Sequence, residues 1–160
     1  MIPRKSRSGY GRVVLGLLMA IGTSQAASAA ERKGVPLLPK YQQECGACHV
    51  AYPPGMLPVA SWPRIMANLQ RHYGTDASLD PATLKELSAW LDANSGTFKR
   101  VREEPPDARI TRSPWFLRKH GEVPAATWKL PAVKSAANCA ACHAGAEQGE
   151  FNEHNVRIPR

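Results

Sequence analysis

The sequence predicts a mainly α-helical fold in which short helices are joined by long loops. Two segments begin like helices, because Asp80 and Ser113 can each cap a helix whose first residue is the proline that follows. The stretch 52–58 is rich in proline and glycine and cannot continue a helix. No β-rich segment surrounds any cysteine. We therefore expect short helices and ordered loops rather than a sheet.

Two short motifs use all four cysteines of the chain. Each has the form Cys-x-x-Cys-His, reading CGACH at 45–49 and CAACH at 139–143. This spacing holds two sulfurs on one side of a turn, where they can add across the two vinyl groups of one haem, and the adjacent histidine supplies the proximal iron ligand. The sequence therefore predicts two covalent c-type haems. Their attachment residues would be Cys45, Cys48, Cys139 and Cys142, and their proximal ligands His49 and His143.

Three simpler interpretations of the cysteines are a redox dithiol, a zinc site and structural disulfides. A thioredoxin-like dithiol would require a βαβ context, which neither motif has. A zinc site would have its Cys-x-x-Cys pairs closer together than the roughly ninety residues that separate these two. Two complete motifs with no thiol left over favour haem over all three interpretations.

Residues 1–30 have the three regions of a cleavable secretory signal: basic residues, an apolar run at 13–21, and small residues up to Ala30. The apolar run is shorter than the roughly 20 residues of a permanent membrane span. We therefore expect the mature chain, 31–160, to be soluble after export. The formal net charge of +8 halves when the signal leaves, and the propionates of two haems would offset the rest. Charge thus gives no reason to expect a nucleic acid partner.

The first haem-bearing half is expected at about 40–95. A short helix should carry residues 45–49 and stop at the proline-rich loop that follows. A second helix should begin at Ser61, as its cap, and close at Gly74.

The clearest helix signature runs from Asp80 to Asn94, and we expect this helix to pack in the core. Its apolar stripe consists of Leu84, Leu87 and Leu91. A charged, aperiodic segment at about 96–110 should form a solvated connector. The second half, about 111–160, should hold a helix that starts at Ser113 and another, capped by Ser135, that delivers the second cysteine motif.

Two further histidines are candidates for the distal iron ligands. Ile65, Leu69 and His72 recur at helical spacing, which places this histidine on an apolar face. Phe116 and His120 share a face in the same way, and both histidines stand just before a helix end. Nearness along the chain pairs His72 with the first haem and His120 with the second, although a crossed arrangement stays open.

Other side chains are weaker candidates for these positions. His154 lies in a short polar tail, Met56 in the proline-rich turn, and Met66 on a helical stripe typical of a core. Histidine ligation on both sides of both irons is therefore the simpler interpretation.

Coordination by two histidines has a functional consequence. An iron with two protein ligands has no open position for a substrate, so we expect an electron carrier rather than an enzyme. Histidine in place of methionine also favours lower potentials. The alternative is a haem enzyme or ligand sensor in which one axial position is open or displaceable.

The motifs, in order, resemble the dihaem cytochrome c family of bacterial periplasms. The resemblance runs over about 40–160, through YPPGMLP, SWPRIMANLQRHYG, ITRSPWFLRKH, VKSAANCAACH and FNEHNVRIPR. It implies a small two-haem cytochrome c, with short helices and long loops packed around the haems, that carries electrons in the periplasm. It also implies His72 and His120 as distal ligands, whereas the family pattern requires no histidine at position 154. The implied redox partners are a high-spin monohaem cytochrome c, of the sphaeroides haem protein type, and a membrane b-type cytochrome.

Overall fold

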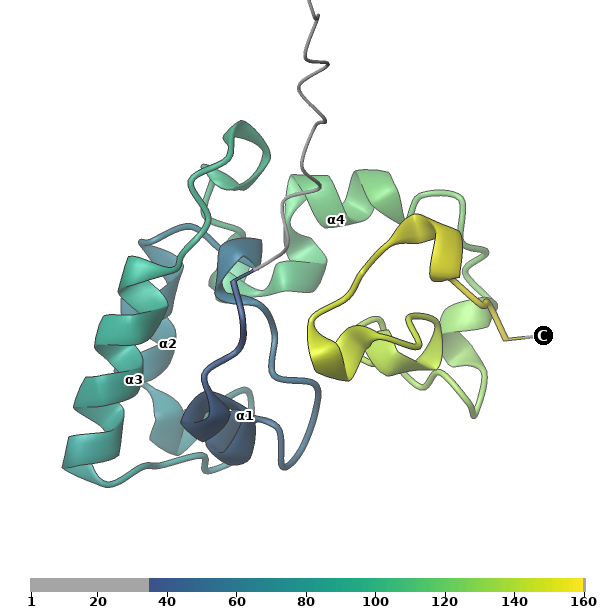
Figure 1. The fold of residues 1–160 in the computed structure, drawn as a ribbon. Coiled ribbons are helices and arrows are strands. Elements are labelled where there is room, and N and C mark those ends of the chain that lie inside the picture. Colours follow the sequence, from purple (N-terminus) through teal and green to yellow (C-terminus); the bar gives the residue numbers. More distant parts are fainter. Residues whose placement is uncertain (1–34, 160) are drawn as a thin grey trace, which may run out of the picture. The chain divides into compact units, whose positions relative to one another are not determined.

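A computed structural model describes residues 35–159, which form four short α-helices (Figure 1). These are α1 (Pro39–Cys45), α2 (Ser61–Met66), α3 (Pro81–Ala93) and α4 (Pro114–Lys119). Single 3-10 turns lie at Pro54–Met56, Leu69–Arg71, Lys99–Val101, Pro106–Ala108, Ile110–Arg112, Thr127–Lys129, Cys139–Ala141, Ala146–Gln148 and Glu153–Asn155. Residues 35–159 contain isolated bridges but no strand, so the predicted fold of short helices and loops is confirmed. The predicted signal at 1–30 lies outside the described residues.

Within the described range, no helix is long and apolar enough to cross a membrane.

The longest helix, α3, begins and ends as the sequence predicts. The Asp80 carboxylate accepts hydrogen bonds of 3.0 Å from the backbone N–H groups of Ala82 and Thr83, which otherwise have no partner in the first turn. Pro81 occupies the first helical position. Leu87 and Leu91 of its apolar stripe are completely buried. The helix is therefore fixed by a local cap at one end and by burial along one side.

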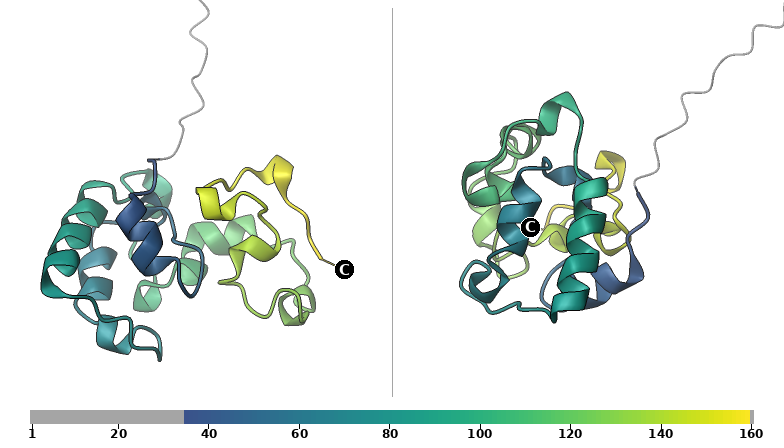
Figure 2. Two further views of the ribbon diagram at one scale, coloured as in Figure 1. Left: turned by 60° about the horizontal axis from the view of Figure 1, so that its bottom comes forward. Right: turned by 90° about the vertical axis from the view of Figure 1, so that its left-hand side faces the viewer.

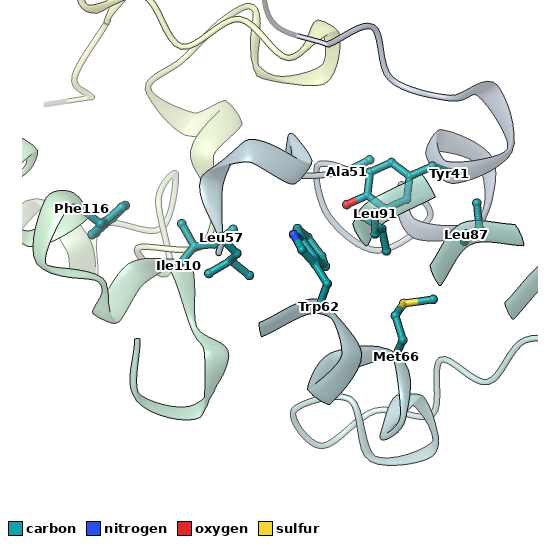
Figure 3. Close-up of a cluster of buried hydrophobic side chains, with 9 residues drawn as sticks. All are labelled: Tyr41, Ala51, Leu57, Trp62, Met66, Leu87, Leu91, Ile110 and Phe116. Atoms are coloured by element: carbon teal, nitrogen blue, oxygen red, sulfur yellow. The ribbon is translucent and has the colours of Figure 1, made fainter. Parts of the chain in front are cut away.

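The main core lies where α1, α2 and α3 meet (Figure 3). Trp62 and Met66 extend from α2 toward the buried leucines of α3, and the α2 and α3 helices lie side by side (Figure 2). The indole N–H of Trp62 donates to the carbonyl of Pro54 at 3.0 Å, so its polar atom is satisfied inside the core. Tyr41 of α1 completes the cluster and is only 3% exposed.

The helix expected between Ser61 and Gly74 is shorter than predicted. Ser61 lies within α2, its side chain makes no cap, and its hydroxyl oxygen is buried without a partner. The helix ends at Met66 because Asn68 leaves the helical conformation (φ −128°, ψ 27°). A separate 3-10 turn then leads to His72, so this histidine is presented by a turn and not by a continuous helical face.

The α4 helix confirms the second predicted cap. The Ser113 hydroxyl accepts a hydrogen bond of 3.2 Å from the N–H of Phe116 and donates one of 2.7 Å to the carbonyl of Ile110. The helix ends at Lys119, and His120 is the first residue beyond it. The capped start and the short length of α4 therefore fix where His120 lies.

The segment 96–110 is not simply a solvated connector. Val101, Pro105 and Ala108 are buried, because two 3-10 turns fold their apolar side chains back toward the helices. The charged residues around them stay outside. These apolar residues are scattered among charged ones, so the sequence pattern did not indicate that they would be buried.

Gly96 fixes the start of this segment by a close backbone approach. Its N–H donates to the carbonyl of Leu57 at 2.7 Å. A Cβ at this position would lie 2.6 Å from the carbonyl oxygen of Gly55 and 2.5 Å from a methyl of Val101. Only glycine fits here without movement of the backbone.

We expect Gly96→Ala to lower the free energy of unfolding by about 1–3 kcal/mol, as overpacking does. Gly55→Ala is the matched control, because no atom lies within 4 Å of the position that its new methyl group would occupy, and a change of no more than about 0.5 kcal/mol is expected there. Denaturant unfolding of the two variants measures the difference. Equal stability would contradict the close approach at Gly96.

Candidate haem sites

The first cysteine motif lies at the end of α1 rather than inside a helix, which corrects the expectation for 45–49. The helix ends at Cys45, and Gly46 closes it by donating its N–H to the carbonyl of Gln42 at 2.9 Å. A Cβ on Gly46 would lie 2.3 Å from that oxygen, so the turn requires glycine at this place. Cys45 is partly buried against the core, whereas Cys48 is exposed.

The second motif also lies on a turn, the 3-10 helix Cys139–Ala141. Asn138 precedes this turn, so Ser135 does not cap it as expected; the Ser135 hydroxyl accepts from a backbone N–H two residues on, at 3.1 Å. The C-terminal segment returns to this motif, where the N–H of Arg157 donates to the carbonyl of Cys142 at 2.9 Å. Backbone contacts from both sides therefore hold the second motif.

No disulfide joins any of the four cysteines, all of which lie within the described residues. Burial raises the pKa of Cys45 to about 11 and that of Cys139 to about 11, so neither is a thiolate at neutral pH. A redox dithiol instead needs a lowered thiol pKa. Across residues 35–159, no group of three or more His, Cys, Asp or Glu side chains could hold a metal ion by itself. The raised pKa values of Cys45 and Cys139 therefore do not fit a redox dithiol.

Each motif histidine faces one of the two other predicted histidines. The ring centroids of His49 and His72 are 6.2 Å apart, with planes 22° apart. The centroids of His120 and His143 are 6.1 Å apart, with planes 69° apart. The partner of each motif histidine is the nearer one along the chain.

These separations fit one metal ion between two imidazoles. With a metal–nitrogen distance of about 2.0 Å and a ring centroid about 1.1 Å behind each nitrogen, two coaxial imidazoles have centroids about 6 Å apart. Both pairs have this spacing although they come from different segments. The side chains present therefore fit a haem iron with a histidine on each face.

Hydrogen bonds at the ring nitrogens add to this fit. His49 Nδ1 lies 2.7 Å from the carbonyl oxygen of Val50, and His120 Nδ1 lies 3.0 Å from that of Phe116. A carbonyl can only accept, so Nδ1 carries the proton and Nε2 keeps its lone pair for a metal. His143 Nδ1 is buried without a partner.

The charge state of the histidines suits metal binding. Burial lowers the pKa of His72, with His49 and Arg109 as smaller causes. Burial also lowers the pKa of His143, with His120 as a smaller cause. Both rings are therefore neutral at pH 7, which is the form that ligates a metal.

Aromatic side chains surround both pairs, and the sequence reasoning did not single out Tyr52, Tyr73 or Phe151 among them as site residues. Tyr52 stacks on His49 with centroids 4.8 Å apart, and Tyr73 packs edge-on against His72 at 4.8 Å. At the second site the contacts are Phe116 and Trp128 on His120, at 4.0 and 6.0 Å, and Phe151 on His143, at 5.4 Å. An aromatic residue adjacent to a histidine, as in HY at 72–73, is the signal that could have revealed one of them.

The weaker ligand candidates lie elsewhere. Met66 is 7% exposed in the core cluster, as expected, and Met56 packs partly buried against that cluster. His154 is exposed on the Glu153–Asn155 turn. It forms no ring contact with either histidine pair among those found in the described residues.

Comparison with known proteins identifies the chain's relatives. The family model for dihaem cytochrome c matches residues 41–151. DHC purified from Rhodobacter sphaeroides is 43% identical, over 73% of this chain and 99% of that one, with a TM-score of 0.63. A diheme cytochrome c from the same organism is 40% identical, over 74% and 100%, with a TM-score of 0.66. A diheme cytochrome type c from Shewanella baltica OS155 is 38% identical, over 78% and 95%, with a TM-score of 0.68. No curated protein matches the sequence.

The matched range contains both cysteine motifs and both facing histidine pairs, whereas His154 lies outside it. The relatives also match over almost their whole length. The chain therefore belongs to the dihaem cytochrome c family and carries two covalently attached haems, one on each Cys-x-x-Cys-His motif.

Proposed function

We propose that this haem-based electron carrier holds both irons between two histidines, His49 with His72 and His143 with His120. The observation that carries the proposal is the distance between the two ring centroids of each pair, 6.2 and 6.1 Å, which leaves room for one metal ion between the rings. The Nδ1 contacts of His49 and His120 support it, since they place the proton on Nδ1 and leave the lone pair of Nε2 free for a metal. A haem closed on both faces passes electrons and has no position for a substrate.

We further propose that the chain works in the periplasm after removal of residues 1–30. The basic, apolar and small-residue regions of that segment support export. By resemblance of the motifs, the proposed redox partners are a high-spin monohaem cytochrome c and a membrane b-type cytochrome.

The first prediction separates a closed carrier from a haem enzyme or ligand sensor. Both haems should give low-spin absorption spectra in the oxidised and the reduced protein, because each iron has two imidazole ligands. Carbon monoxide added to the native reduced protein should leave the spectrum unchanged on mixing. A high-spin component, or rapid carbon monoxide binding, would support an open position instead.

Exchange of a distal ligand should change one potential. His120→Met replaces a histidine ligand by methionine, and Met/His ligation raises the potential within the roughly 0.8 V range that axial ligands control. His154→Met is the matched control and should leave both potentials unchanged. Spectroelectrochemical titration of the two haems measures both. If the His154 variant shifts a potential and the His120 variant does not, the ligand assignment is wrong.

The two oxidised haems should give different electron paramagnetic resonance signals. The relative orientation of the two imidazole planes sets the splitting of the iron d orbitals, and the planes are 22° apart in one pair and 69° apart in the other. We expect a rhombic low-spin signal from the first haem and a more anisotropic one from the second. Removal of the His72 imidazole by His72→Ala should abolish the rhombic signal only. Two identical signals in the native protein would contradict this geometry.

A further inference from the structure

One side chain touches both haem sites. The ring of Tyr52 stacks on His49, with centroids 4.8 Å and planes 19° apart. Its hydroxyl donates a hydrogen bond of 2.8 Å to the carbonyl of Ala137, which is 85 residues further along the chain. Ala137 stands two residues before Cys139, an attachment residue of the second haem. Tyr52 therefore joins the histidine of the first motif to the segment that holds the second haem.

Tyr52 is fixed at its backbone as well as at its ring. Its carbonyl accepts a hydrogen bond of 2.8 Å from the hydroxyl of Tyr41, which is itself part of the core. The Tyr52 hydroxyl must be the donor in its bond to Ala137, because a carbonyl oxygen can only accept. Tyr52 is thus anchored to the core through its backbone carbonyl and to the segment of the second haem through its hydroxyl.

Two side chains approach the carbonyl of Ala137, and after haem attachment only Tyr52 can still donate a hydrogen bond to it. The thiol of Cys139 also points at the carbonyl of Ala137, at 3.7 Å. In the haem-bearing protein that sulfur is a thioether and has no hydrogen to donate. The hydroxyl of Tyr52 then remains as the side-chain donor to this carbonyl. The carbonyl belongs to Ala137, two residues before the cysteine that forms the thioether bond.

We propose that Tyr52 couples the two haems electronically, through the contacts from the His49 ring to the Tyr52 ring and on to Ala137 and Cys139. In one exchange, the ferrous iron of one haem becomes ferric and the ferric iron of the other becomes ferrous. One electron moves, no proton moves, and Tyr52 stays a neutral phenol. The inference rests on the proposed ligation of the first iron by His49.

Tyr73 provides a matched control within the same haem site. Its ring packs against His72 with centroids 4.8 Å apart, and its hydroxyl donates to the carbonyl of Asp107 at 2.9 Å. It therefore has the same chemistry as Tyr52, an aromatic contact with a histidine and a hydrogen bond to a carbonyl. The difference is that this carbonyl does not belong to the second haem segment.

The experiment compares Tyr52→Phe, Tyr52→Leu and Tyr73→Phe in the protein with both haems attached. One haem is reduced by a short pulse, and the rate of internal electron exchange and the separation of the two midpoint potentials are measured. Tyr52→Phe should slow the exchange several-fold because it removes only the hydrogen bond, and Tyr52→Leu should slow it further. Both should change the separation of the potentials, and both should slow the exchange more than Tyr73→Phe does, because that variant measures the general effect of losing a tyrosine hydroxyl beside the first haem.

Native exchange rates in both Tyr52 variants would overturn the proposal, as would an equal loss in Tyr73→Phe, which would indicate general loosening. If Tyr52→Leu fails to retain both haems, the isosteric Tyr52→Phe decides the question alone. Failure of the underlying ligation is a separate result, because it would appear as a high-spin spectrum in the native protein whatever the exchange rates.

Discussion

Two pairs of imidazole rings lie with their centroids 6.2 and 6.1 Å apart, and under the proposed ligation the rest of the structure has to hold this spacing. Each pair combines a ring beside a cysteine motif with a ring that follows a short helix or turn. If α4 continued past Lys119, the helical rotation of about 100° per residue would fix the direction of His120. Because α4 ends there, His120 lies just beyond the helix end. Short helices are therefore what this geometry requires, and local caps such as Ser113 fix where they begin.

The apolar core is distributed unevenly between the two halves. The main cluster joins α1, α2 and α3, and reaches Ile110 and Phe116 (Figure 3). Beyond residue 120, the buried apolar side chains in the described range are Val133 and Ala146. A chain of this size has little surface to bury in any case. Most of the buried apolar side chains in the described range therefore belong to the first half.

Features set by neighbouring residues could be predicted from the sequence, and features set by distant contacts could not. The caps at Asp80 and Ser113, and the stripe of α3, follow from local hydrogen bonds and helical spacing. The end of α2 at Met66 comes with a break from helical conformation at Asn68 that no residue marks in the sequence, and the burial of Val101 depends on how the segment 96–110 folds back. The sequence singles out His49 and His143 by the adjacent cysteines, and His72 and His120 by their spacing from apolar residues, because these signals are local. The structure brings the four histidines together in two facing pairs. Tyr52 was missed because its partner lies 85 residues away.

Each haem site has a pair of histidines, but the residues around the two pairs differ. Next to His72, the guanidinium of Arg109 lies 4.1 Å from the ring centroid of Tyr73, and its positive charge favours the ferrous over the ferric iron. Around His120 the neighbours are Phe116 and Trp128, and an apolar environment also disfavours the additional charge of ferric iron. Salt screens the half-exposed Arg109, whereas it does not screen the cost of desolvation. Under the proposed ligation, two irons with the same ligand set can therefore differ in potential, and such a difference would set the direction in which an electron moves between the haems.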